Sequence, residues 1–151
     1  MIHVCKFLAT GCGIGYIGKG GGTFAAAAFC IVWYGAGVSD EKSWMAATII
    51  LVVAAIGIWC ASIVEREWGI DSSRVVIDEI AGMGISLLFL PVTPAYVIAG
   101  FVLFRFFDIV KPFFIRKLEA LPGGWGVMMD DVLAGIYTNL ILHVALYFKI
   151  F

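Results

Sequence analysis

Three clusters of ionisable side chains interrupt a sequence that is otherwise largely apolar. Each cluster borders an apolar run that is long enough to form a helix. The clusters are Asp78 with Glu79, Arg105 with Asp108 and Lys111, and Asp130 with Asp131. Charged groups beside or within membrane-embedded segments are costly to desolvate and are usually functional. We therefore expect these clusters to carry the chemistry of the protein.

The two acid pairs share a local pattern, in which an aspartate precedes the glycine of an Ala-Gly pair by one helical turn. Asp78 stands before Gly82 in this way, and Asp131 stands before Gly135. Small residues let two helices approach closely, which would bring the two acid pairs together. Four neighbouring carboxylates repel one another unless a hard cation lies between them, and magnesium prefers such oxygen ligands. The pattern predicts one or two Mg²⁺ ions bound by Asp78, Glu79, Asp130 and Asp131.

Helix capping is the alternative interpretation of the same acids. Negative charge at a helix N-terminus is favoured by about 0.3–1 kcal/mol. Capping accounts for one acid of each pair but not for both.

Two further segments are suited to binding phosphate. Arg105, Asp108 and Lys111 are three positions apart, so on a helix they form one stripe about 120° wide. Arginine can bind a phosphate with two parallel hydrogen bonds and lysine can act as a point charge, while Asp108 can orient Arg105 or add a metal ligand. The alternative is a local salt-bridge ladder.

A glycine-rich loop at residues 11–22 carries Lys19 and leads into a helix at Thr23. The backbone N–H groups of such a loop, together with the helix dipole, can bind phosphate. The alternative is a flexible re-entrant loop, because glycine adopts loop conformations freely. We therefore expect Lys19 and Thr23 to contact phosphate, with Arg105 and Lys111.

Composition places these residues in a membrane protein. Hydrophobic residues make up 62% of the 151 residues, the mean hydropathy is +1.03, and the net charge is -1 without a basic tail. This hydrophobic content is well above that of soluble domains. The lack of a basic tail does not suggest a nucleic-acid partner. We expect one domain over residues 1–151, with membrane lipids around it; the oligomeric state is left open.

The expected fold is an all-α, compact polytopic bundle of short membrane helices. The apolar runs that could cross the membrane are 23–38, 43–64, 75–90, 95–111 and 132–148. Pro91 and Pro94 interrupt the stretch 80–104, because proline lacks an amide donor and disfavours helix before it. We interpret this interruption as a helical hairpin, although a single kinked span is the alternative.

The hairpin gives a clear asymmetry of positive charge. It puts eight cations on one side and leaves Lys42 and Lys149 on the other. The eight are Lys6, Lys19, Arg66, Arg74, Arg105, Lys111, Arg116 and Lys117. Since positively charged loops favour the cytoplasm, the three clusters should face the cytoplasm together. A single span over 80–104 would instead separate the two acid pairs by the membrane.

Three blocks of this sequence resemble the motifs of the phosphatidylglycerophosphatase A family, in order and spacing. They are residues 77–83, 104–112 and 123–135. The chain departs from the family pattern at two places. The family's N-terminal loop has Pro-Gly-Thr where this chain has Gly21-Gly22-Thr23. The family's lysine motif continues Pro-x-Pro-Ile, where this chain has Pro112-Phe113-Phe114-Ile115. The acids are intact.

The resemblance implies a magnesium-dependent phosphatase of the bacterial inner membrane that converts the phospholipid phosphatidylglycerophosphate to phosphatidylglycerol. Asp78, Glu79, Asp108, Asp130 and Asp131 are the expected catalytic residues. The nucleophile is either a water activated by magnesium, with one carboxylate as base, or a carboxylate that forms an aspartyl-phosphate. A small transporter or channel subunit is the rival interpretation, since broken helices and intramembrane charges also occur there.

Overall fold

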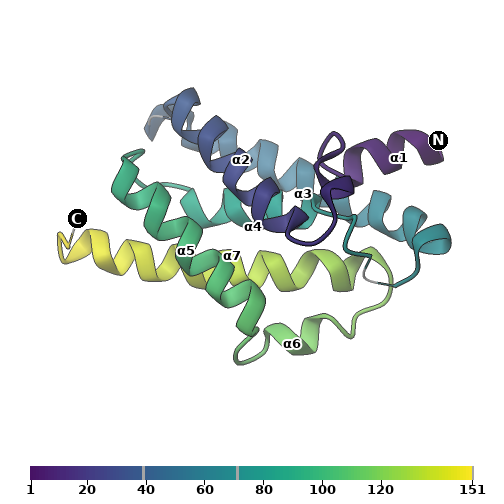
Figure 1. Ribbon diagram of the computed structural model, residues 1–151. Coiled ribbons are helices and arrows are strands. Elements are labelled where there is room, and N and C mark those ends of the chain that lie inside the picture. The colour runs from purple at the N-terminus through teal and green to yellow at the C-terminus, as the bar shows by residue number, and fades with distance from the viewer. Residues whose placement is uncertain (39, 71, 151) are drawn as a thin grey trace.

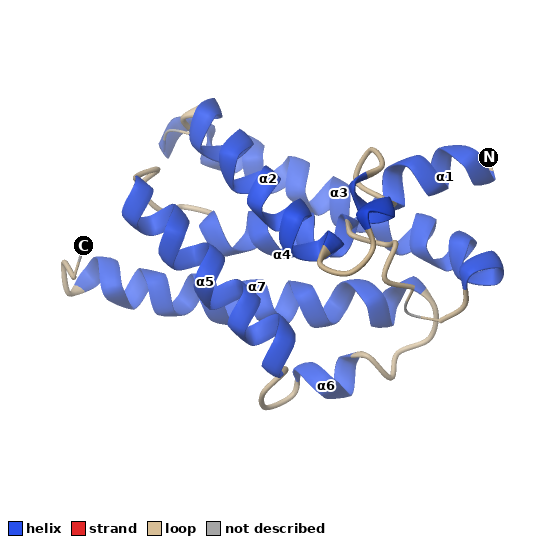
Figure 2. Ribbon diagram, in the orientation of Figure 1, coloured by secondary structure: helices blue, strands red, loops and turns tan. Residues whose placement is uncertain are grey.

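The computed structural model describes residues 1–38, 40–70 and 72–150, and over these residues the chain is entirely helical between its loops (Figure 2). The helices are α1 (Ile2–Ala9), the 3-10 helix η1 (Ile14–Ile17), α2 (Gly21–Ala36), α3 (Asp40–Trp68), α4 (Ile77–Leu87), α5 (Pro94–Val110), α6 (Ile115–Leu118) and α7 (Gly124–Tyr147). The all-α prediction is confirmed.

Helix α4 lies at the centre of the bundle and contacts α2, α3, α5 and α7 (Figure 1). Its 11 residues rise about 17 Å at 1.5 Å each, too little to cross a hydrocarbon core of about 30 Å. Most of its side chains are buried, including those of Met83 and Leu87. The helix therefore forms the core of the bundle, surrounded by longer helices.

The predicted hairpin around the two prolines is present. Helix α4 ends at Leu87, and the chain turns through Phe89, which has a φ of 58°. Helix α5 begins at Pro94, and the Thr93 hydroxyl caps it by accepting a hydrogen bond from the Tyr96 amide at 3.4 Å. A hydroxyl N-cap followed by proline is a common start of a helix. The kinked-span alternative is wrong.

The last helix differs from the prediction. Helix α7 starts at Gly124, eight positions before the expected start at residue 132. The glycines at 123, 124 and 126 permit close packing at the start of this helix. A Cβ on Gly124 would lie 2.1 Å from the Ile58 carbonyl oxygen of α3. Asp130 and Asp131 therefore lie inside a helix, and the capping interpretation fails for that pair.

Among the residues that the structure describes, two helices are long and apolar enough to cross a membrane: Lys42–Trp68 within α3, and Gly124–Tyr147. Large apolar side chains point outward from the bundle, among them Leu51 of α3, Val102 of α5 and Val144 of α7. An exposed apolar surface of this extent marks contact with lipid or another protein. The N-terminus and the C-terminus lie at opposite ends of the bundle (Figure 1).

Candidate active site

The acid pairs meet where α4 and α7 cross. A Cβ on Gly82 would lie 2.6 Å from the Asp131 carbonyl oxygen, and one on Gly135 would lie 2.4 Å from the Gly82 carbonyl oxygen. Real Cβ atoms do not approach so closely, so only glycine permits this crossing. The predicted role of the two Ala-Gly pairs is confirmed. The crossing places Asp78 and Asp131, each one turn earlier on its helix, beside one another.

Three carboxylates form a cluster that could hold a metal ion. Asp78, Glu79 and Asp131 each offer an oxygen, and these oxygens lie within 4.8 Å of one another. Asp78 and Asp131 are 8% and 3% exposed. Within the described residues, Asp78 Oδ1 and Glu79 Oε2 are buried without a hydrogen-bond partner. Because an unsatisfied buried carboxylate is costly, a hard divalent cation fits this donor set.

Asp130 has different partners from its neighbour. Its Oδ2 accepts a hydrogen bond from Lys111 Nζ at 2.7 Å, and its Oδ1 accepts one from the Asp131 amide at 3.0 Å. Lys111 also pairs with Glu119. Two acids thus hold the ammonium group of Lys111 in the site.

The Arg105 guanidinium lies between two acids of the site. Its Nη1 is 2.5 Å from Asp108 Oδ2, three positions along α5, and 3.9 Å from Glu79 Oε1 of α4. The alternative interpretation expected a local ion pair on this helix, and the pair between Arg105 and Asp108 is present. However, Arg105 also reaches the carboxylate cluster, so the ion pair holds a cation in the site.

One cavity of about 260 Å³ joins these groups. Its walls carry charged side chains from α4, α5, α7 and the glycine loop: Lys19, Asp78, Glu79, Arg105, Asp108, Lys111, Asp130 and Asp131. Of the predicted site residues, Thr23 is not among the lining residues and its side chain is exposed. Lys19 is exposed, and among the described residues it has no ion pair. It is therefore a cation available to a ligand.

The glycine loop packs directly on the cluster. Gly22, at the start of α2, has so little space that a Cβ would lie 1.8 Å from Glu79 Oε1. Gly18 and Gly20 have φ values of 87° and 91°, a conformation that favours glycine. The loop therefore has a defined shape that closes one side of the cavity.

Sequence reasoning missed three polar residues of the site. Ser72 and Ser73 line the cavity, and Glu119 is the second partner of Lys111. The serines follow the end of α3 and precede the acid pair of α4 closely, and this position is the only signal that could have identified them. Glu119 lies in the turn after α6, and no local pattern connects it to Lys111.

The fold and the site define a membrane-associated helical protein with a buried acidic cluster and three cations facing one cavity. The protein family and the relatives that this chain resembles support this classification. The family model for phosphatidylglycerophosphatase A matches residues 7–146. A Haemophilus influenzae protein named phosphatidylglycerophosphatase A is 34% identical, over 99% of this chain and 93% of its own length. The Escherichia coli protein of that name is 33% identical, over 95% and 84%.

The chain therefore belongs to the phosphatidylglycerophosphatase A family, whose members are phosphatases. The expectation of an enzyme is confirmed, and the transporter interpretation is set aside. A Bacteroides thetaiotaomicron protein is 44% identical over 91% of both chains; its name gives it, provisionally, as a phosphatidylinositol-3-phosphatase. No solved structure matches the chain.

Proposed function

We propose that this protein hydrolyses the terminal phosphate of phosphatidylglycerophosphate, releasing phosphatidylglycerol and phosphate in phospholipid biosynthesis. The supporting observation is that the carboxylate cluster and the cations Lys19, Arg105 and Lys111 face one cavity. A phosphate monoester needs both, because cations neutralise its oxygens and a metal site promotes attack on phosphorus.

Magnesium is the proposed ion, held by Asp78, Glu79 and Asp131. When bound, it would polarise a phosphoryl oxygen and offset the negative charge that builds up during attack. The prediction that Asp130 is a further ligand stays a prediction. Because both of its oxygens accept hydrogen bonds from protein donors, Asp130 is left out of this ligand set. We assign Asp130 instead to positioning Lys111.

The chain's own residues then bind and orient the phosphate. Arg105 presents its guanidinium to two phosphate oxygens, and Lys111 and Lys19 add point charges. Asp108 Oδ2 pairs with Arg105, so we assign its Oδ1 as the acceptor of the proton that the attacking water loses. The bond from water oxygen to phosphorus forms as the bond to the head-group oxygen breaks. The leaving oxygen takes a proton from solvent in the cavity.

A covalent aspartyl-phosphate is the alternative route. It predicts that hydroxylamine traps a phosphorylated carboxylate during turnover. The water route predicts that no hydroxamate forms on any carboxylate during turnover with hydroxylamine.

The substrate head group is the second open choice. The Bacteroides relative favours phosphatidylinositol 3-phosphate as a candidate, because it is 44% identical to this chain, whereas the two phosphatidylglycerophosphatase A proteins are 34% and 33% identical. Both lipids carry a phosphate monoester beyond a phosphodiester, so the same cluster serves either. We propose the glycerol head group, because the match to the family covers nearly the whole chain.

Phosphate release from each lipid by the purified full-length protein tests the proposal. We expect the higher kcat/KM for phosphatidylglycerophosphate, and we expect EDTA to abolish activity until Mg²⁺ is restored. Asp78→Asn and Asp131→Asn should abolish turnover. Glu67→Gln is the matched control, because Glu67 pairs with Lys6 outside the cavity. Equal activity of the aspartate variants and the control would refute the metal-site assignment.

We also propose that the protein is a multi-pass protein of the bacterial inner membrane with this cavity open to the cytoplasm. The cations that line the cavity come from the loop before α2 and from the C-terminal end of α5. Positive charge is retained on the cytoplasmic side of membrane proteins.

A further inference from the structure

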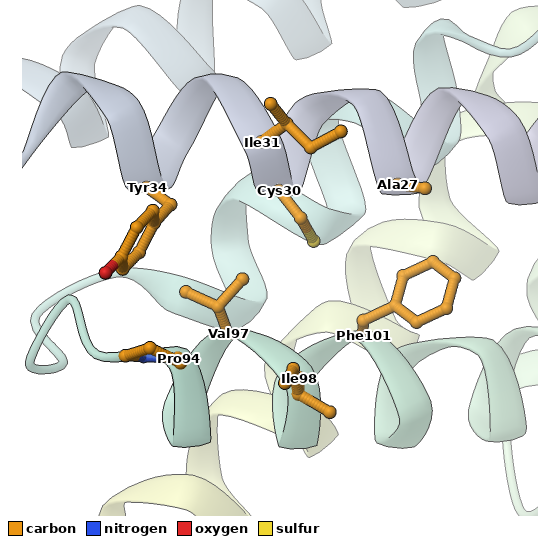
Figure 3. A pocket seen from close by; sticks show the side chains of 8 residues that line it. All are labelled: Ala27, Cys30, Ile31, Tyr34, Pro94, Val97, Ile98 and Phe101. Atoms are coloured by element: carbon orange, nitrogen blue, oxygen red, sulfur yellow. The ribbon is translucent and has the colours of Figure 1, made fainter.

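An apolar groove runs between α2 and α5, the two helices that also frame the phosphate-binding side of the cavity. It encloses about 430 Å³. Its eight lining residues carry no charged side chain: Ala27, Cys30, Ile31, Tyr34, Pro94, Val97, Ile98 and Phe101. Figure 3 shows Cys30 and Tyr34 extending from α2 toward α5, and Val97 and Phe101 extending from α5 toward α2.

The groove has a closed floor and open rims. Cys30 and Val97 are 7% and 8% exposed, whereas Ile31 and Ile98 are 75% and 62% exposed. The groove is thus open along its length to the surroundings of the bundle. In a membrane, that opening faces the acyl chains of the lipids.

The groove begins one turn from the phosphate site and extends away from it. On α5, Phe101 precedes Arg105 by one turn; on α2, Ala27 follows Gly22 by little more than one turn. The lining from Ala27 to Tyr34 then covers about 10 Å of helix at 1.5 Å per residue. The direction is that of a phospholipid, whose chains extend from the head group into the hydrocarbon layer.

We propose that this groove binds one acyl chain of the phospholipid whose phosphate is cleaved in the cavity. The inference rests on the proposed function, because it assumes a lipid-linked phosphate. Its support is the continuity of the two sites along the same pair of helices, together with the contrast between charged walls at one end and apolar walls at the other. A head group alone would leave this groove unused.

Blocking the groove tests the proposal. Ala27→Trp fills it from α2, and Ile98→Trp fills it from the rim of α5, where no core residue is displaced. Val32→Trp and Val102→Trp are matched controls, since both residues are well exposed on the same helices and do not line the groove. The substrates are dioleoyl and dihexanoyl phosphatidylglycerophosphate in detergent micelles, with the full-length protein.

We expect both groove variants to raise KM for the dioleoyl lipid about tenfold, the effect of losing the burial of about two methylene groups. Their kcat, and their kcat/KM for the dihexanoyl lipid, should match the controls. Equal effects of the groove variants and the controls would overturn the proposal. So would a loss that instead follows Leu140→Trp, in the second apolar groove beside Phe107 and Tyr137.

A binding measurement separates this inference from the proposed function. Retention of dioleoyl phosphatidylglycerol is measured by native mass spectrometry, which needs no turnover. If wild-type protein releases no phosphate from phosphatidylglycerophosphate, the proposed function fails. Loss of retained lipid in Ala27→Trp and Ile98→Trp, but not in the two controls, would still support the groove, whereas unchanged retention would refute it.

Discussion

The close contact between α4 and α7 should control the activity of the site, and Gly135→Ala tests this. The added Cβ would lie 2.4 Å from the Gly82 carbonyl oxygen, whereas ordinary contact begins at 3.4 Å. Helices α4 and α7 would therefore have to separate by about 1 Å at this point. Overpacking of this kind costs about 1–3 kcal/mol of stability.

The same displacement acts on the carboxylate cluster one turn away. Asp78 and Asp131 lie on the two helices that would move, so their separation grows by a comparable amount. A misplacement of 1 Å in a catalytic constellation costs about 10²-fold in rate. We expect Gly135→Ala to lose about that much kcat and to need more Mg²⁺ for half-maximal activity.

Gly35→Ala is the matched control, because Gly35 is also helical and a Cβ there meets nothing within 4 Å. Phosphate release is measured over a magnesium titration, with a thermal unfolding curve for each variant. A Gly135→Ala protein that unfolds at a lower temperature yet keeps wild-type kcat and magnesium dependence would refute the link between the helix crossing and the metal site.

Three other perturbations address the loop, the phosphate contacts and the topology. Gly22→Ala should lower kcat/KM at least tenfold, because its Cβ would lie 1.8 Å from Glu79 Oε1; activity equal to that of Gly35→Ala would contradict this. Arg105→Lys should lower kcat/KM about 10²-fold or more, since lysine cannot form the bidentate contact with phosphate. An unchanged kcat/KM would show that Arg105 forms only a local ion pair. Single cysteines at Thr93 and Lys117, in a background without the native cysteines, should react with an impermeant reagent from opposite sides of the membrane; reaction from the same side would exclude the proposed orientation.

Local sequence chemistry was sufficient for much of the fold. The Thr93-Pro94 start of α5 combines a hydroxyl cap with a residue that has no amide to lose, so its position could be predicted. The length of α4 could not. Its end at Leu87 is satisfied from another helix, because the Asn139 side-chain amide donates hydrogen bonds to the Ser86 and Leu88 carbonyls at 3.3 and 2.9 Å.

The sequence by itself indicated the charged residues that line the cavity, but not Ser72, Ser73 or Glu119. It also indicated why two glycines stand one turn after two aspartates, since charge in apolar surroundings and small residues at helix contacts have few other uses. Only the tertiary structure decided that the two acids of the second pair have different partners. Asp130 and Asp131 are neighbours in sequence, but about 100° of helix rotation separates their side chains. One therefore meets Lys111 and the other meets Asp78 and Glu79. That choice depends on which helices pack on each face of α7, which no local pattern records.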